Sequence, residues 1–198
     1  MSTTLINPTT GTAIGEVPHT SAEETDQIID RAQAAFASWR AVAPGERARL
    51  LRAFAAVVDS HIEELAQLEV KNAGHTVGNA RWEAGNVRDC LNYYSAAPER
   101  LFGRQIPVPG GVDITFHEPL GVVGAILPWN VPLVLMMLKI APALVAGNTV
   151  VVKSAEEAPF ATLEAGRLMA ELLPPGVVNI VSGFGEDCGA PLVAHPHV

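Results

Sequence analysis

The sequence predicts an α/β protein in which a helical N-terminal segment precedes a parallel β-sheet. Apolar residues recur at helical spacing up to about residue 97, whereas short apolar runs alternate with helical stretches after residue 119. A Pro-Gly-Gly turn lies between the two patterns. Strands that alternate with helices are typical of a parallel sheet whose strands are joined by helical crossovers.

The composition limits the class of protein. The 198 residues are 48% hydrophobic and 17% charged, and their net charge of -8 does not suit binding to nucleic acid phosphates. Cys90 and Cys188 form no disulfide or metal-binding motif, so a reducing, cytoplasmic location without a metal site is expected. The apolar stretch 119–147 is interrupted by Pro128 and Pro142, so no membrane span is predicted.

Residues 1–104 are predicted to contain one or two extended strands followed only by helices. The first helix has a capping box, in which Ser21 and Glu24 each satisfy a free amide of the first turn. Pro44 suits the first turn of the next helix. The expected helices begin at Ser21, at Pro44, at Ser60 (capped with Glu63) and at Ala80, and the third ends near Gly74.

Two further units follow the helices. Residues 105–118 are predicted to form a hairpin, with strands at 105–108 and 113–117 joined through Pro109-Gly110-Gly111. Residues 119–198 are predicted to form a partial βαβαβα unit, which is an incomplete Rossmann-like parallel sheet. Its strands are expected at 121–127, 149–153 and 177–181, and its helices at 132–146, 159–172 and 185–194.

Three loops follow the predicted strands, at the edge where ligands of an open parallel sheet bind. In the first loop, Pro128 and Pro132 stiffen the segment that carries Asn130, whose side-chain amide is able to stabilise a developing oxyanion. The alternative is that Asn130 caps the following helix and Trp129 fills the core. On residue chemistry alone, the cap is the favoured interpretation.

The other two loops carry signals that are weak when taken singly. Glu156 is placed to bond ribose hydroxyls, and Lys153 to bond the ribose or face a 2′-phosphate. A surface Lys–Glu pair would give the same pattern. Gly183, Gly185 and Gly189 resemble a phosphate turn without its usual spacing, and a tight strand-to-helix turn would also explain them.

Four segments match, in order and spacing, as one continuous block. They are Gly121-Val-Val-Gly-Ala-Ile-Leu-Pro-Trp-Asn-Val-Pro132, Lys139-Ile-Ala-Pro-Ala-Leu144, Ala146-Gly-Asn-Thr-Val-Val-Val-Lys-Ser-Ala-Glu156 and Pro174-Pro-Gly-Val-Val-Asn-Ile-Val-Ser-Gly-Phe-Gly185. This block resembles the NAD(P)-dependent aldehyde dehydrogenase superfamily, and the resemblance covers essentially the whole chain.

The resemblance implies a role for each loop. Asn130 matches the residue that donates to the aldehyde oxygen and the thiohemiacetal oxyanion in the family, which makes it the implied catalytic residue. The implied cofactor is NAD or NADP, with NAD favoured by Glu156. Its implied contacts are Ile126, Leu127, Pro128, Trp129, Asn130, Lys153, Ser154, Glu156, Gly185 and Gly189.

The resemblance also bears on the rest of the chain and its partners. Residues 1–104 correspond to strands and helices of the family's cofactor-binding domain, and the hairpin at 105–118 resembles strands that relatives use to form oligomers. The implied partners are a small aldehyde and either a second copy of the chain or a complementary chain.

The nucleophilic cysteine and the general-base glutamate of the family lie beyond the part that this sequence matches. Cys90 falls inside a predicted helix and Cys188 in the third loop, so neither is expected to replace the nucleophile. We therefore expect a truncated aldehyde dehydrogenase chain that is inactive alone. The alternatives are a non-catalytic cofactor-binding or oligomerising module, or one half of a split enzyme.

Overall fold

A three-stranded parallel sheet in the order β5-β6-β7 organises the computed structural model, which describes all 198 residues. The strands are β5 (Val122–Ile126), β6 (Thr149–Lys153) and β7 (Val178–Val181). All five residues of β6 are buried, because a central parallel strand is covered on both faces. The crossovers are α5 (Pro132–Ala146) and α6 (Phe160–Ala170).

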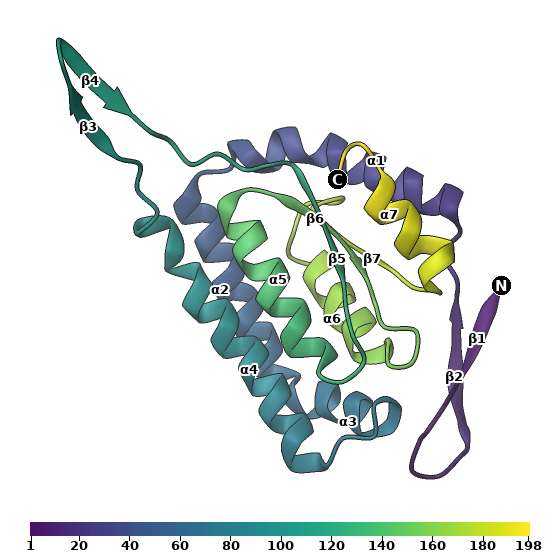
Figure 1. Cartoon of the computed structure of the whole chain (residues 1–198). Coiled ribbons are helices and arrows are strands. Elements are labelled where there is room, and N and C mark those ends of the chain that lie inside the picture. Colours follow the sequence, from purple (N-terminus) through teal and green to yellow (C-terminus); the bar gives the residue numbers. More distant parts are fainter.

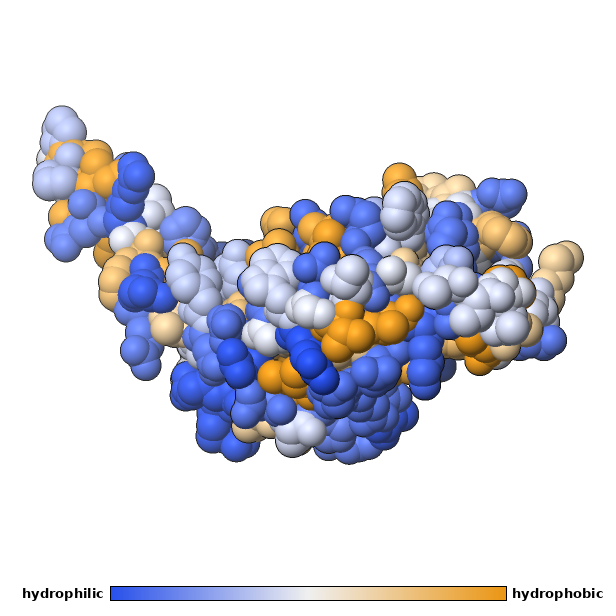
Figure 2. Space-filling view, turned by 90° about the horizontal axis from the view of Figure 1, so that it is seen from below, coloured by the Kyte–Doolittle hydropathy of each residue, from blue (hydrophilic) through white to orange (hydrophobic).

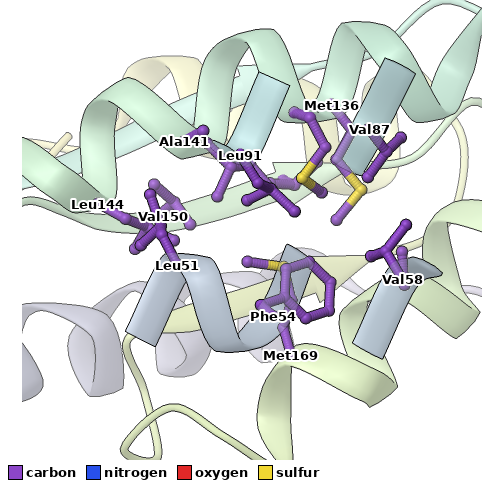
Figure 3. Packing of buried hydrophobic residues seen from close by; sticks show 14 of the residues in the cluster. Leu51, Phe54, Val58, Val87, Leu91, Met136, Ala141, Leu144, Val150 and Met169 are labelled. Carbon is purple, nitrogen blue, oxygen red and sulfur yellow. The ribbon is translucent and has the colours of Figure 1, made fainter. Parts of the chain in front are cut away.

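Helices cover both faces of this sheet (Figure 1). α1 (Ala22–Ala41) and α7 (Ala190–Ala194) lie on one face, and α5 and α6 lie on the other. A further layer packs on α5 and α6 and consists of α2 (Pro44–Ser60), α3 (Ile62–Asn72) and α4 (Val77–Ser95). The main core lies between these layers, where Phe54, Leu91 and Met136 meet (Figure 3).

Two antiparallel pairs lie outside the parallel sheet. β1 (Ser2–Ile6) pairs with β2 (Ala13–Pro18) at the N-terminus. β3 (Gln105–Val108) pairs with β4 (Gly111–Ile114), after the short 3-10 helix η1 (Ala97–Glu99). This hairpin projects from the body, all of its strand residues are exposed, and apolar atoms are visible on it (Figures 1 and 2).

The C-terminal end of α5 is fixed by side chains from the first two helices. A helix leaves its last carbonyls without intrahelical partners. The Trp39 indole donates to the Leu144 carbonyl at 3.3 Å, and Nε of the buried Arg47 donates to the Val145 carbonyl at 3.0 Å. Gly147 then ends the helix in the left-handed conformation, with φ of 101°. These contacts hold α5, whose other end carries the loop after β5.

The predicted fold class is confirmed, together with most helix boundaries. α1 has the expected capping box at Ser21, α2 begins at Pro44, and α5 spans the predicted residues. None of the helices has both the length and the apolar character that crossing a membrane requires.

Several boundaries differ from the prediction. Ser60 does not cap α3, because its hydroxyl donates back to the Val57 carbonyl within α2. α4 begins earlier than expected, after a cap by Thr76, and β4 spans Gly111–Ile114 instead of 113–117. The expected last helix begins instead with the π-helical turn η2 (Gly185–Gly189) before α7.

Candidate functional site

Two hollows flank the loop that follows β5. The first has a volume of about 520 Å³ and the second a volume of about 480 Å³. Trp129 lines the first and Asn130 lines the second, so neighbouring residues of one loop face different hollows. The first hollow lies beyond the carboxyl ends of β5 and β6, where open parallel sheets bind ligands, and the second lies between the loop and α4.

Eight of the ten predicted cofactor positions line the first hollow, which we call the sheet-end hollow. They are Ile126, Leu127, Pro128, Trp129, Lys153, Glu156, Gly185 and Gly189. They come from the ends of β5 and β6 and from η2, three segments that the fold brings together. A Cβ built on Gly185 would meet no atom within 4 Å, so this glycine leaves open space on the wall of the hollow.

Lys153 and Glu156 form an ion pair at the wall of the sheet-end hollow. Lys153 is only 3% exposed, so the pair is not the surface pair that the sequence left open. Burial raises the pKa of Glu156, but the hydrogen bond and charge of Lys153 outweigh it and hold the pKa below its usual value. The carboxylate therefore stays ionised as a hydrogen-bond acceptor, with a third of its side chain exposed.

The two alternatives for the first loop are excluded. Trp129 is 58% exposed and does not fill the core. The residue that precedes α5 is Val131, and no side chain caps the helix from that position, so Asn130 is not a helix cap. The Asn130 backbone carbonyl accepts a hydrogen bond from His75 Nε2 at 2.9 Å, whereas its side chain makes no hydrogen bond within the protein. Its amide is thus free to bind a ligand.

Ser154 does not line either hollow. Its side chain is fully buried, and its hydroxyl donates to the Val181 carbonyl at 3.2 Å across the sheet. The structure therefore places Ser154 as a link between β6 and β7, and a direct cofactor contact from its side chain does not fit this geometry.

The two cysteines lack the environment of a reactive thiol. Burial raises the pKa of Cys90 to about 11. Cys188 belongs to η2 and is fully buried, and burial likewise raises its pKa. A thiol becomes a nucleophile as the thiolate, which these environments disfavour. The expectation that neither cysteine is a nucleophile agrees with these positions.

The second hollow, which we call the Asn130 hollow, contains residues that sequence reasoning missed. Its lining is Asn130 and Val131 from the loop, with His75, Asn79, Trp82 and Glu83 from α4 and the turn before it. Glu83 lies on the buried face of α4 between Ala80 and Val87, where an apolar residue is the usual choice. This charged residue within an apolar stripe was the signal in the sequence that could have pointed to the second hollow.

The sheet and its helical crossovers define an α/β protein with an incomplete Rossmann-like parallel sheet and a hollow at its carboxyl edge. The model of the family described as "Aldehyde dehydrogenase family" matches residues 1–198. The chain therefore belongs to the aldehyde dehydrogenase family.

Known relatives agree with this assignment. The chain is 39% identical to Aminoaldehyde dehydrogenase 2, peroxisomal, of Pisum sativum, a match covering 98% of this chain and 41% of the relative. A putative aldehyde dehydrogenase from Burkholderia cenocepacia superimposes with a TM-score of 0.97 at 39% identity, covering all of this chain and 41% of the other. The chain thus spans about two fifths of the length of these relatives.

Solved relatives include complexes with either nicotinamide cofactor. The structure of PnpE in complex with nicotinamide adenine dinucleotide matches all of this chain and 41% of that one, with a TM-score of 0.97 and 36% identity. The glyceraldehyde-3-phosphate dehydrogenase GapN of Methanocaldococcus jannaschii, complexed with NADP, matches 98% of this chain and 44% of that one, with a TM-score of 0.95 and 30% identity.

Proposed function

We propose that this chain supplies the cofactor site and the oxyanion donor of an enzyme that oxidises an aldehyde to a carboxylic acid. The observation that carries the proposal is the loop after β5, which places Trp129 in the sheet-end hollow and Asn130 in the Asn130 hollow. Hydride transfer requires that the cofactor and the substrate lie next to each other. The loop has one hollow on each side, which would place a cofactor in one and a substrate in the other.

The sheet-end hollow fits a nicotinamide dinucleotide. Its volume of about 520 Å³ is within the range of small-molecule sites, about 300–1,000 Å³. The wall is largely apolar, and its charged residues are Glu157 and the pair of Lys153 with Glu156, which is suited to the hydroxyls of a ribose. NAD is the favoured cofactor, because an ionised Glu156 repels a 2′-phosphate.

In the proposed reaction, an aldehyde, NAD⁺ and water give a carboxylic acid, NADH and a proton. A thiolate adds to the aldehyde carbon, and the carbonyl oxygen becomes an oxyanion that the Asn130 side-chain amide stabilises. The nicotinamide, when bound, accepts the hydride. Because Cys90 and Cys188 are unsuited as nucleophiles, we propose that the nucleophile and the general base come from a segment outside these 198 residues.

Calorimetric titration of the chain with NAD and NADP tests the cofactor site. We expect saturable NAD binding that is weaker in Lys153→Met, and tighter NADP binding in Glu156→Gln than in the unaltered chain. No NAD binding by a folded chain would contradict the proposal. A panel of aldehydes with NAD should give no NADH from the chain alone, and saturable turnover would refute the need for a further segment.

A second candidate is a non-catalytic module that pairs with a complementary chain or with its own copy. β5 pairs with β6 on one side only, and a hollow of about 450 Å³ runs along it, lined in part by Val123, Ile126 and Leu138. Unpaired strand edges promote association, and the exposed hairpin adds apolar surface. Light scattering after gel filtration should then show an oligomer, whereas a monomer at high concentration counts against it.

The cysteines and the net charge bear on the location and the partners of the protein. Free thiols at Cys90 and Cys188 favour a reducing compartment such as the cytoplasm. The net charge of -8 argues against nucleic acid as a partner, and no membrane partner is proposed. Fractionation of the source cells tests the location.

A further inference from the structure

His75 lies between two buried carboxyl groups beneath the loop after β5. Its Nδ1 is 3.0 Å from Glu83 Oε2 and 3.7 Å from Glu69 Oε2. Glu69 and Glu83 are each 1% exposed, and neither oxygen of Glu69 has a hydrogen-bond partner. Two buried carboxyls are costly unless a cation or a shared proton compensates them, so this arrangement needs a role.

The same residues hold both ends of the turn that carries Asn130. His75 Nε2 donates to the Asn130 carbonyl at 2.9 Å, and Glu83 Oε1 accepts the Leu133 amide at 3.1 Å. Val131 offers no side-chain cap to α5, and proline at position 132 has no amide to donate. Glu83 therefore acts as the N-terminal cap of α5 from another helix, with its negative charge at the positive end of the helix dipole.

A proton is the species that best fits between these groups. Because Nε2 carries the hydrogen that it donates to Asn130, unprotonated Nδ1 would face carboxyl oxygens with no hydrogen between them. Nδ1 lies 3.0 Å from Glu83 Oε2, within ion-pair distance, but like the Glu69 oxygens it has no hydrogen-bond partner. Three ligand atoms of this cluster lie within 4.8 Å of one another, so a divalent cation is the competing occupant, which Zn²⁺ binding tests.

We propose that His75 and Glu83 are positioning residues, which clamp the Asn130–Leu133 turn so that the Asn130 side-chain amide faces the hollow beside it. This inference rests on the proposed function, because Asn130 is the oxyanion donor only in that reaction. The clamp itself is a structural claim about the 198 residues and is testable without turnover.

The structural test is amide hydrogen exchange, followed by NMR in the unaltered chain and in variants. His75→Ala and Glu83→Ala should each speed exchange at Leu133 and Leu135 about tenfold, the effect of losing one hydrogen bond. His75→Gln should restore protection, because its side-chain amide still donates to the Asn130 carbonyl. The Val151 amide in β6 must keep its rate, which separates loss of the clamp from global unfolding.

The functional test uses the chain together with the segment that supplies the nucleophile and the general base, in a preparation that oxidises aldehydes. His75→Ala should lower kcat about tenfold with an unchanged KM for NAD, since one misplaced oxyanion donor affects the transition state and not the sheet-end hollow. His75→Gln should recover most of kcat, and Lys71→Ala, on the exposed side of α3, should behave as the unaltered protein.

The two tests fail separately. If no preparation oxidises aldehydes, the proposed function is refuted, while hydrogen exchange still decides the clamp. Unchanged exchange in both His75→Ala and Glu83→Ala would overturn the clamp. Stoichiometric Zn²⁺ binding that is lost in His75→Ala would assign the cluster to a metal ion and overturn it too.

Discussion

Replacing Glu69 by glutamine should stabilise the protein at alkaline pH. Burial, and to a smaller extent the charge of Glu83, raise the pKa of Glu69 from an ordinary value of 4.5 to about 8. Between pH 4.5 and about pH 8, Glu69 keeps its proton in the folded state and has lost it in the unfolded state. The free energy of unfolding must then fall as the pH rises from about 4.5 to about 8.

The size of this effect follows from the two pKa values. Each pKa unit changes the free energy of unfolding by about 1.4 kcal/mol. The difference between 4.5 and about 8 therefore lowers it by about 5 kcal/mol in full, of which about 4 kcal/mol is reached at pH 8. Glu69 is 1% exposed, so solvent screening does not reduce this figure much. Glu69→Gln removes the titration, and its stability should exceed that of the unaltered protein increasingly towards pH 8.

Urea unfolding followed by circular dichroism, at half-unit steps from pH 4.5 to pH 8.5, measures the difference. Glu64→Gln, on the exposed side of the same helix, is the matched control and should keep the pH dependence of the unaltered protein. A Glu69→Gln curve that runs parallel to that of the unaltered protein across the whole range would refute the reasoning. Any slope that remains in Glu69→Gln belongs to other groups, first among them Glu83, whose pKa burial also raises.

Three further substitutions or reactions test other parts of the structure. Gly185→Val should weaken NAD binding at least about tenfold by calorimetry without loss of stability, because the valine side chain enters the open hollow. The control Gly45→Val, in α2, also places its side chain in open space and should leave NAD binding unchanged. Arg47→Met should lower the free energy of unfolding by about 3 kcal/mol in urea, because the buried Val145 carbonyl and its neighbours lose their donor; a loss below about 1 kcal/mol would contradict this. Cys90 should react with iodoacetamide about 100-fold more slowly than a free cysteine at pH 8, because burial raises its pKa to about 11.

Local signals in the sequence were sufficient where the structure uses local chemistry. The capping box at Ser21 and the left-handed Gly147 each depend on a few neighbouring residues, and both lie where the sequence predicts. Ser60 had the spacing of a cap with Glu63, but α2 continues through Ser60 and uses its hydroxyl internally. A capping pattern indicates where a helix is able to start, whereas packing of the preceding helix decides whether it does.

In the candidate site too, contacts between neighbouring residues were predictable, whereas contacts between distant segments were not. Lys153 and Glu156 are three residues apart, so their pairing was visible in the sequence. His75 and Glu83 contact the Asn130 turn from positions 55 and 50 residues before their partners, and no local pattern encodes these contacts. A buried carboxylate needs a partner, so Glu83 in the apolar stripe of α4 predicts that one exists. Only the packing of α4 against α5 identifies that partner, which is the Leu133 amide in the first turn of α5.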